Sequence, residues 1–324
     1  MKNRIVNLSP GPSPLSKHLW NDYLERIAIG SSHYDLVTQS HHSKRSREFI
    51  SELKNKVAHS LGLSDSQQVC FLASSARESF CRIDGFMNML SYQMTHHITG
   101  YWSRWACSNS QFKSNSYDKT CLHACLNETV DGVYSEPPSH SHLVVDATSM
   151  LFTKEVKKAA IIYASGQKIF SSPGFSIVII DQELISQKET GRYSDQLGNY
   201  ITNDSCNVTP PMHAMVLLDT FIDWLEFRGG ADWLKQRTNY RAANIYDRLS
   251  ASDALLVEPS VRSMTAITFD VGQRHDKWLA YFNGRKISGI LGHKQKGGFR
   301  ISNFPGLSEE DYEYLLDCLE NVND

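Results

Sequence analysis

Two short apolar segments rich in isoleucine and valine, 159–164 and 175–180, flank a turn that carries Lys168. The turn, at 163–174, reads Tyr-Ala-Ser-Gly-Gln-Lys-Ile-Phe-Ser-Ser-Pro-Gly. Apolar segments of this length, bounded by Gly, Ser and Pro, predict buried strands, so Lys168 is expected at a strand end in a tight turn. Taken alone, such a lysine is more often a solvated turn residue, and a functional reading needs support from elsewhere in the chain.

That support comes from an aspartate at the end of another apolar segment. Residues 143–149 read Leu-Val-Val-Asp-Ala-Thr-Ser, which predicts a strand ending at Asp146 and followed by small hydroxyl residues. An acid at the carboxyl end of a parallel strand faces the ligand crevice of an open α/β sheet. Pyridoxal phosphate needs an acid beside its pyridine nitrogen and a lysine for its aldehyde. Asp146 and Lys168 together therefore indicate pyridoxal-phosphate chemistry.

The order of predicted elements favours an α/β fold, with a mainly parallel sheet in a large domain and a smaller C-terminal α+β domain. We place the large domain at 15–226 and the small domain at 227–324, and we assign the N-terminal arm 1–14 to the small domain. Helical periodicity or capping residues predict helices at 16–27, 46–61, from about 77 to 90, at 212–227 and 231–249, and from Ser308 onward. Further strands are expected at 69–72, 264–271, 287–291 and 298–302, and 34–45 is expected to be a polar loop.

Composition limits the possible partners and compartments. The 324 residues are 41% hydrophobic and 21% charged with a formal charge of -2, so we expect a large core and no electrostatic attraction to nucleic acid or membrane. No apolar run approaches the roughly 20 residues of a membrane span, and we expect a cytoplasmic protein. Seven cysteines, an odd number, favour free thiols. Cys121, His123 and Cys125 would share one face of a strand without a fourth ligand, so we expect no metal there.

At this point several motifs, taken in order, resemble the phosphoserine aminotransferases, which are class-V aminotransferases of the fold-type I pyridoxal-phosphate enzymes. The similarity spans most of the chain. The motifs are Asn-Leu-Ser-Pro-Gly-Pro at 7–12, Asn-Glu-Thr-Val-Asp-Gly at 127–132, Gly-Gln-Lys at 166–168, Thr-Pro-Pro at 209–211, and Gly-His at 292–293 with Gly-Gly-Phe-Arg at 297–300.

The resemblance implies roles for the residues around the cofactor. Lys168 would be the Schiff-base lysine and proton shuttle, Asp146 would pair with the ring nitrogen, and Thr129 would hydrogen-bond the phenolic oxygen. Trp102 would stack on the ring, although without the family context core packing is its more common role. The cofactor phosphate would lie at a helix start after Ala73, where the family usually has glycines and this chain has serines. The remaining residues implied at the cofactor are Ser75, Ala76, Arg77, Thr148, Gln167, Asn207 and Thr209.

The resemblance also implies a homodimer, because in the family the threonine that matches Thr209 reaches the cofactor phosphate of the neighbouring subunit. On the substrate side, Arg300 would hold the α-carboxylate and His293 would contact the substrate, with Lys294 at a position where the family commonly has arginine. In the family, a histidine and an arginine further upstream bind the substrate phosphate. In this chain that pair can be aligned either with His41 and His42 or with Lys44 and Arg45, and Arg45 is the preferred match.

Three readings of the function follow. In the first, glutamate loads the cofactor and a phosphorylated 2-oxo acid, 3-phosphohydroxypyruvate, accepts the amine. In the second, a diverged homologue keeps the cofactor and serves a specialised biosynthetic pathway with another amino or oxo acid. The third, a catalytically silent scaffold subunit, is disfavoured by the intact Lys168, Asp146 and Thr129.

Overall fold

The fold is known from a computed structural model, which describes residues 5–110, 119–154, 159–187 and 196–323. Residues 1–4 of the expected N-terminal arm lie outside the described residues. None of the helices in these ranges combines the length and the apolar character that crossing a membrane requires.

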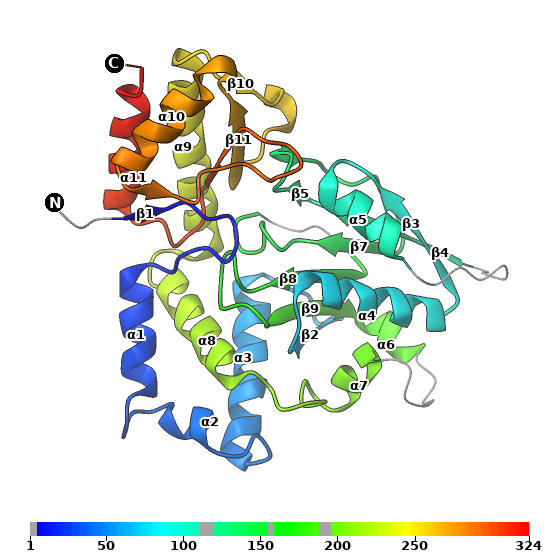
Figure 1. Ribbon diagram of the computed structural model, residues 1–324. Helices are drawn as coiled ribbons and strands as arrows, with labels where there is room; N and C mark the ends of the chain where they lie inside the picture. Colours follow the sequence, from blue (N-terminus) through cyan, green and yellow to red (C-terminus); the bar gives the residue numbers. More distant parts are fainter. Residues whose placement is uncertain (1–4, 111–118, 155–158, 188–195, 324) are drawn as a thin grey trace.

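A six-stranded mixed sheet forms the centre of the molecule (Figure 1). Its strands, in spatial order, are β2 (Gln67–Leu72), β9 (Ser176–Asp181), β8 (Ile161–Ser165), β7 (Leu143–Asp146), β4 (Lys119–Cys125) and β3 (Tyr92–His97). Strands β8, β7, β4 and β3 pair in parallel, whereas β9 is antiparallel to both of its neighbours. This confirms the predicted mainly parallel sheet. Strand β9 is reversed because the short turn that carries Lys168 cannot provide the long crossover that a parallel connection needs.

Helices cover both faces of this sheet. One face packs against α1 (Lys17–Ile27), α3 (Lys44–Ser60) and α8 (Met212–Glu226), and the other against α4 (Ala76–Met89), α5 (Tyr101–Asn109), α6 (Gln182–Ser186) and α7 (Gln196–Thr202). Along β8, Ile162 and Ala164 enter the first core and Ile161 and Tyr163 the second. Burial on both faces explains why β8 and β9 are largely apolar instead of alternating with polar residues.

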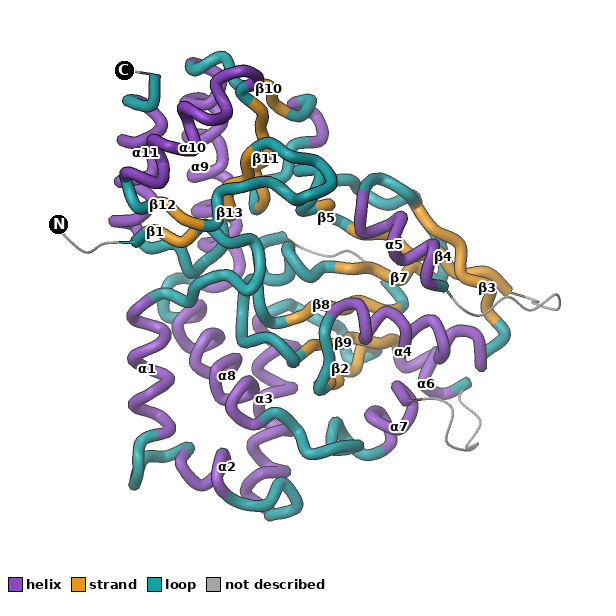
Figure 2. Tube along the Cα trace, in the orientation of Figure 1, coloured by secondary structure: helices purple, strands orange, loops and turns teal. Residues whose placement is uncertain are grey.

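The C-terminal part has its own core. Helices α9 (Gly230–Ala251), α10 (His275–Gly284) and α11 (Glu309–Glu320) surround a small antiparallel sheet of β10 (Leu255–Leu256), β11 (Ala266–Asp270) and β13 (Phe299–Ser302). Figure 2 shows these strands grouped apart from the six-stranded sheet. The separate core supports our proposed division into a domain at 15–226 and a second domain at 227–324.

The N-terminal arm joins the C-terminal part although it lies at the opposite end of the sequence. Its strand β1 (Val6–Asn7) pairs in parallel with β12 (Ile287–Ser288), and Val6 and Leu8 are buried in the C-terminal core. A second short pair, β5 (Asn127–Glu128) and β6 (Val133–Tyr134), is antiparallel and follows β4.

Local capping explains several helix starts. The Ser16 hydroxyl accepts a hydrogen bond from the Leu19 amide at 3.2 Å, and Ser308 accepts one from the Asp311 amide at 3.0 Å, as the sequence predicted. The prediction of a continuous loop at 34–45 is wrong. A short helix, α2 (Tyr34–Thr38), forms there, and α3 begins already at Lys44 because the Ser43 hydroxyl accepts from the Ser46 amide.

Candidate active site

Lys168 lies in the turn between β8 and β9, at the edge of the sheet where the parallel strands end. The Gly166 amide donates to the Phe175 carbonyl at 2.8 Å and closes the turn. A side chain at Gly166 would meet the Ser171 Cβ at 2.8 Å, so this position requires glycine. The Lys168 Nζ donates to the Thr129 hydroxyl at 3.2 Å. Burial lowers the pKa of Lys168, and the nearby Asp146 carboxylate opposes that shift.

The N-terminal arm holds this turn from the outside. Ser13 donates its backbone amide to the Gln167 carbonyl at 2.9 Å and its hydroxyl to the Lys168 carbonyl at 2.7 Å. A Cβ at Gly11 would lie 3.5 Å from the Lys168 Cε, so the arm packs directly against the lysine side chain. The arm thereby fixes the backbone from which the reactive amine projects.

Asp146 occupies the last position of β7, as the sequence predicted. One of its oxygens accepts from the Thr148 amide at 2.9 Å, and Tyr163 lies beside it as its cross-strand neighbour on β8. Burial raises the pKa of Asp146, while the Thr148 hydroxyl and amide, the Lys168 charge and Tyr163 oppose that shift. The carboxylate is therefore partly desolvated and has neighbours that oppose its protonation.

Trp102 and Thr129 meet on the other side of the lysine. The Thr129 hydroxyl accepts from the Trp102 indole nitrogen at 3.1 Å, and the Lys168 Nζ lies 6.0 Å from the centre of the indole ring. The helix that carries Trp102 is anchored by Glu128, whose fully buried carboxylate accepts the Trp102 and Ser103 amides at 2.6 and 2.8 Å. A carboxylate at a helix N-terminus satisfies amides that have no partner within the helix.

Arg300 enters the site from β13 of the C-terminal part. Its side chain is 8% exposed and its Nη1 donates to the Thr129 carbonyl at 2.8 Å, while its buried Nε has no hydrogen-bond partner among the described residues. Burial lowers the pKa of Arg300 to about 10, which leaves the guanidinium charged at neutral pH. A buried arginine with an unused donor is prepared to bind an anion.

These side chains line one cavity of about 310 Å³, at the lower end of the usual range for small-molecule sites. It lies at the carboxyl ends of β7 and β4 and is closed by the arm and the C-terminal part. Sequence-predicted residues that line it are Ser75, Ala76, Arg77, Trp102, Thr129, Asp146, Thr148, Gln167, Lys168, His293 and Arg300.

One end of the cavity is suited to an anion. Ser75 caps the 14-residue helix α4, whose first turn contains Ala76 and Arg77. The Arg77 guanidinium lies 5.7 Å from the centre of the Trp105 ring. Opposite this turn, the Gln167 amide oxygen accepts from the Ser165 hydroxyl. Amide donors and the positive end of the helix dipole favour a phosphate at this position.

Five residues that the resemblance assigns to the site do not line this cavity. Lys294 is exposed beside His293, and Thr209 is exposed after α7. Asn207 and His42 are also outside the cavity. Arg45 is outside it as well and donates to the Ser32 carbonyl, with the Asp35 carboxylate 3.8 Å from its Nη1. Any contact of these residues with a bound ligand would therefore occur in another chain or after a rearrangement.

The cavity also contains residues to which sequence analysis gave no role. They include Phe80, Trp105, Cys125, Asn127, Ser149 and Tyr163. The motif at 127–132 was recognised for Thr129, but the anchoring role of Glu128 was not foreseen. Tyr163 could have been found from strand alternation, since it follows Ile161 on one face of β8 and lies in register with Asp146.

Comparison with known proteins agrees with this geometry. Solved structures of similar fold include a phosphoserine aminotransferase from Bacillus circulans subsp. alkalophilus, with a TM-score of 0.87, 22% identity and 98% of each chain covered. A pyridoxal-phosphate-bound phosphoserine aminotransferase from Trichomonas vaginalis has a TM-score of 0.87 and 20% identity, covering 98% of this chain and 100% of that one. The fold is accordingly that of the fold-type I pyridoxal-phosphate-dependent transferases.

The sequence pattern described as Aminotransferase class-V matches residues 118–296. The chain therefore belongs to the class-V aminotransferase family and is a pyridoxal-phosphate-dependent aminotransferase. A phosphoserine aminotransferase of Listeria monocytogenes is 26% identical over 350 residues, which cover 98% of this chain and 96% of that protein. One from Alkalihalobacillus alcalophilus is 26% identical over 339 residues, covering 93% of each.

The residues present fit the cofactor. One small cavity contains an amine, a carboxylate, a hydroxyl and an indole ring, with a helix start suited to an anion at one end. This donor set matches the aldehyde, ring nitrogen, phenolic oxygen, ring face and phosphate of pyridoxal phosphate.

Proposed function

We propose that this enzyme moves an amino group between glutamate and a phosphorylated 2-oxo acid, 3-phosphohydroxypyruvate, with phosphoserine as the product. The observation that carries the proposal is Arg300, a buried cation with an unused Nε donor that lines the same cavity as Lys168. Both substrates carry an α-carboxylate, and one arginine fork can bind it in each half-reaction. The relatives that match nearly the whole chain are named phosphoserine aminotransferases, which supports the choice of substrate.

Pyridoxal phosphate, when bound, supplies a protonated ring that withdraws electrons from the substrate α-carbon. Asp146 would hold the ring nitrogen, Thr129 the phenolic oxygen and Trp102 the ring face. Ser75, Ala76, Arg77, Thr148 and Gln167 would hold the phosphate end. Lys168 would act as nucleophile and as the base that moves the α-proton, and its lowered pKa increases the fraction of neutral amine available for both tasks.

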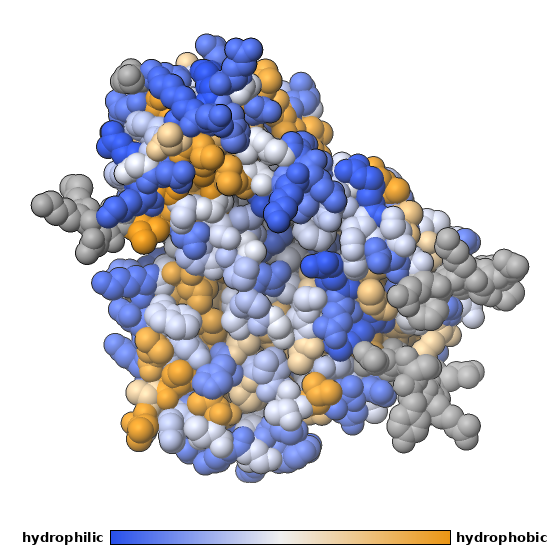
Figure 3. All heavy atoms as spheres, in the orientation of Figure 1, coloured by the Kyte–Doolittle hydropathy of each residue, from blue (hydrophilic) through white to orange (hydrophobic). Residues whose placement is uncertain are grey.

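A homodimer with shared active sites completes this proposal. Asn207 and Thr209 do not reach the cavity of their own chain, and in the dimer they would approach the cofactor phosphate of the second subunit. His42 or Arg45 would likewise supply cations for the substrate phosphate, beside His293 and Lys294. Apolar side chains of α1 and the loop that follows, Trp20, Leu24 and Ile29, are exposed in the single chain, and Figure 3 shows apolar surface over this region. Exposed apolar surface of this kind supports burial against another subunit.

A diverged homologue that acts on a different amino or oxo acid is the second candidate. It is favoured by Lys294, an exposed point charge outside the cavity, and by Arg45, which is already engaged with Ser32 and Asp35. If these contacts persist in the dimer, the cations expected for a substrate phosphate are not in place.

We further propose a cytoplasmic location. All seven cysteines are free, and one of them, Cys107, is exposed. Free thiols are typical of a reducing compartment.

Half-reactions of the purified, cofactor-loaded protein test the proposed function. We expect the visible absorbance of the bound cofactor to be bleached by glutamate and by phosphoserine, and borohydride to fix the cofactor to Lys168. The variant Lys168→Ala should lose the band that borohydride traps, whereas Lys294→Ala, at an exposed lysine outside the cavity, should keep it. Bleaching by glutamate but not by phosphoserine would exclude the proposed substrate and favour the second candidate. A protein that cannot be loaded with cofactor would exclude both.

A further inference from the structure

A row of polar side chains extends from Asp146 at the cavity across the neighbouring strands. Tyr163 lies opposite Asp146 on β8, and its hydroxyl is 3.0 Å from the Nε2 of His123 on β4. The Nδ1 of His123 is in turn 3.3 Å from the Nδ1 of His96, its cross-strand partner on β3. Tyr163 and His123 are only 2% and 1% exposed, so water does not supply their partners.

The protonation states of these groups limit how the hydrogens can be arranged. Burial lowers the pKa of His123 to about 3 and that of His96 to about 4, so both imidazoles are neutral near pH 7 and each carries one N–H. Burial raises the pKa of Tyr163 well above its ordinary value, so the phenol keeps its hydrogen. Each contact therefore contains one hydrogen, and all of them must point the same way along the row.

Two arrangements satisfy this condition, and they differ at both ends of the row. If the hydrogens point away from Asp146, the tyrosine lone pairs face the carboxylate, and His96 keeps a buried Nε2–H. That Nε2 has no hydrogen-bond partner among the described residues. If the hydrogens point toward Asp146, the carboxylate receives the Tyr163 hydroxyl, and only an acceptor lone pair of His96 is left unpaired. The second arrangement is favoured because a carboxylate accepts only, and because an orphaned buried N–H is rarer than an orphaned acceptor.

We propose that His96, His123 and Tyr163 form a one-way hydrogen-bond chain whose donors all point toward Asp146, and that this chain positions the carboxylate and keeps it ionised against the cofactor's ring nitrogen. The inference rests on the role proposed for Asp146. The proposed chain gives a function to His123, the middle residue of the Cys-His-Cys alternation of β4. The His123 ring also packs against Phe80, with the ring centres 4.9 Å apart. Without Tyr163, the Thr148 hydroxyl and amide would be left as the hydrogen-bond donors that oppose protonation of Asp146.

The arrangement of hydrogens can be read directly from the cofactor-free protein. Nitrogen-15 NMR of the full chain labelled at histidine distinguishes the two neutral tautomers, and the variants His96→Asn and His123→Asn assign the two signals among the 13 histidines. We expect His123 to carry its hydrogen on Nε2 and His96 on Nδ1, and both to stay neutral from pH 8 down to about pH 5. The opposite tautomers, or protonation of either ring by pH 6, would overturn the inference. This measurement does not depend on any activity.

The link to the cofactor is tested with Tyr163→Phe, which removes only the hydroxyl. The matched control is Tyr92→Phe, because Tyr92 is also buried and makes a hydrogen bond to a histidine, His142, at 3.0 Å, but lies outside the cavity. With pyridoxal phosphate labelled at the ring nitrogen, we expect Tyr163→Phe to shift the nitrogen signal toward the unprotonated form and to raise the cofactor dissociation constant about tenfold, the usual effect of losing one hydrogen bond to a charged group. Tyr92→Phe should change the dissociation constant less than twofold and leave the signal in place.

An unchanged ring-nitrogen signal and an unchanged dissociation constant in Tyr163→Phe would refute the positioning role. If that variant does not fold, the histidine tautomers of the parent protein decide the question alone. Failure of the parent to bind pyridoxal phosphate would instead count against the role proposed for Asp146, and the two failures are thereby distinguished.

Discussion

Replacing Arg300 by lysine tests whether this residue is the carboxylate clamp of both half-reactions. In the parent, the guanidinium is held by the Thr129 carbonyl through Nη1 and has a free Nε donor. A bound carboxylate would receive two charge-assisted hydrogen bonds, each contributing about 1.5–3 kcal/mol. Lysine keeps the charge and loses the fork, so about 2–3 kcal/mol of binding should be lost. Because about 1.4 kcal/mol corresponds to a factor of ten, kcat/KM should fall roughly 30- to 150-fold.

The assay is a pair of single half-reactions, followed by the cofactor absorbance, with glutamate and with phosphoserine as amino donors. Since both donors carry the same α-carboxylate group, both rates should fall by similar factors while the band of the resting holoenzyme is unchanged. Arg241→Lys is the control, because Arg241 is also buried and its Nη1 donates to a carbonyl, that of Leu307, at the same 2.8 Å, but it lies outside the cavity. A loss of less than threefold for both donors in Arg300→Lys would refute the assignment.

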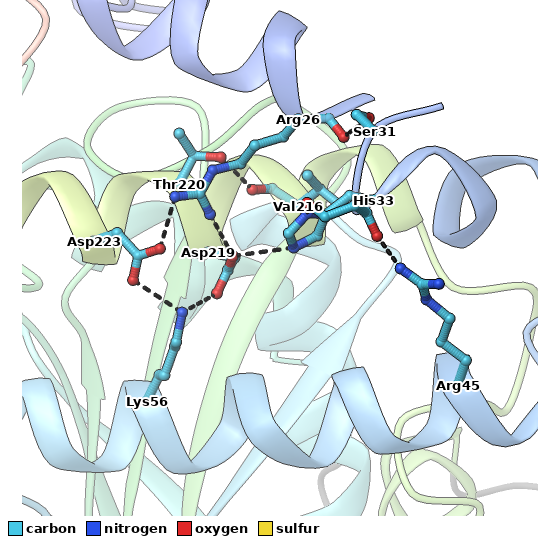
Figure 4. A network of polar contacts seen from close by, with 10 residues as sticks. Arg26, Ser31, His33, Arg45, Lys56, Val216, Asp219, Thr220 and Asp223 are labelled. Atoms are coloured by element: carbon cyan, nitrogen blue, oxygen red, sulfur yellow. Dashed lines mark hydrogen bonds and ion pairs between the residues drawn. The ribbon is translucent and has the colours of Figure 1, made fainter. Parts of the chain in front are cut away.

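Two further predictions concern the supports of the site and of the fold. Glu128→Gln should lower the free energy of unfolding by about 2 kcal/mol, because the Trp102 and Ser103 amides donate to different oxygens of Glu128 and glutamine has only one side-chain oxygen. The variant should also bind the cofactor more weakly. An unchanged thermal midpoint would contradict the anchoring role of Glu128. Asp219 accepts from Arg26 and Lys56 at 2.6 Å each (Figure 4), and these partners with His33 hold the pKa of Asp219 below its usual range. The stability that the ionised Asp219 gives to the fold is therefore fully present above the ordinary aspartate pKa of about 3.9. It is lost as the pH falls through the lower pKa of Asp219 in the folded state. Asp219→Asn should cost about 1–3 kcal/mol in thermal or urea unfolding at pH 7, and the difference from the parent should shrink as the pH approaches 3. The more exposed Asp223, which contacts the same two cations, should give a smaller loss as Asp223→Asn, and equal losses would contradict the importance of burial.

The sequence predicted the elements whose signals are local. Ser16 and Ser308 cap helices as expected, and the isoleucine-rich segments around Lys168 are adjacent strands of the sheet. The short helix at Tyr34–Thr38 was missed because five residues carry too little periodicity to be separated from a polar loop. The strand Tyr92–His97 was missed because it lies at the edge of the sheet and is only partly buried, so polar residues are tolerated along it.

In the candidate site, too, the sequence predicted the residues that have a local signal and missed those that depend on tertiary packing. Asp146, Thr129 and Lys168 were identified because a family resemblance and the strand ends pointed to them, and the structure brings all three to one cavity. The row formed by Tyr163, His123 and His96 was not foreseen, because it depends on the register of neighbouring strands far apart in the sequence. Arg45 and Thr209 lie outside this cavity, and the roles proposed for them require a second subunit.

The packing of the N-terminal arm has a consequence for the order in which the protein is made. Residues 5–14 leave the ribosome well before residues 287–302, yet Val6 pairs with Ile287, and the Leu8 carbonyl accepts from the hydroxyl of Ser302 at 2.6 Å. Contacts with such a separation in sequence form late in folding. During synthesis the Lys168 turn is therefore present before the arm is anchored over it. The pocket is completed only when the segments at 287–288 and 299–302 have been made and hold the arm, so a chain terminated before them would leave the site around the lysine unfinished.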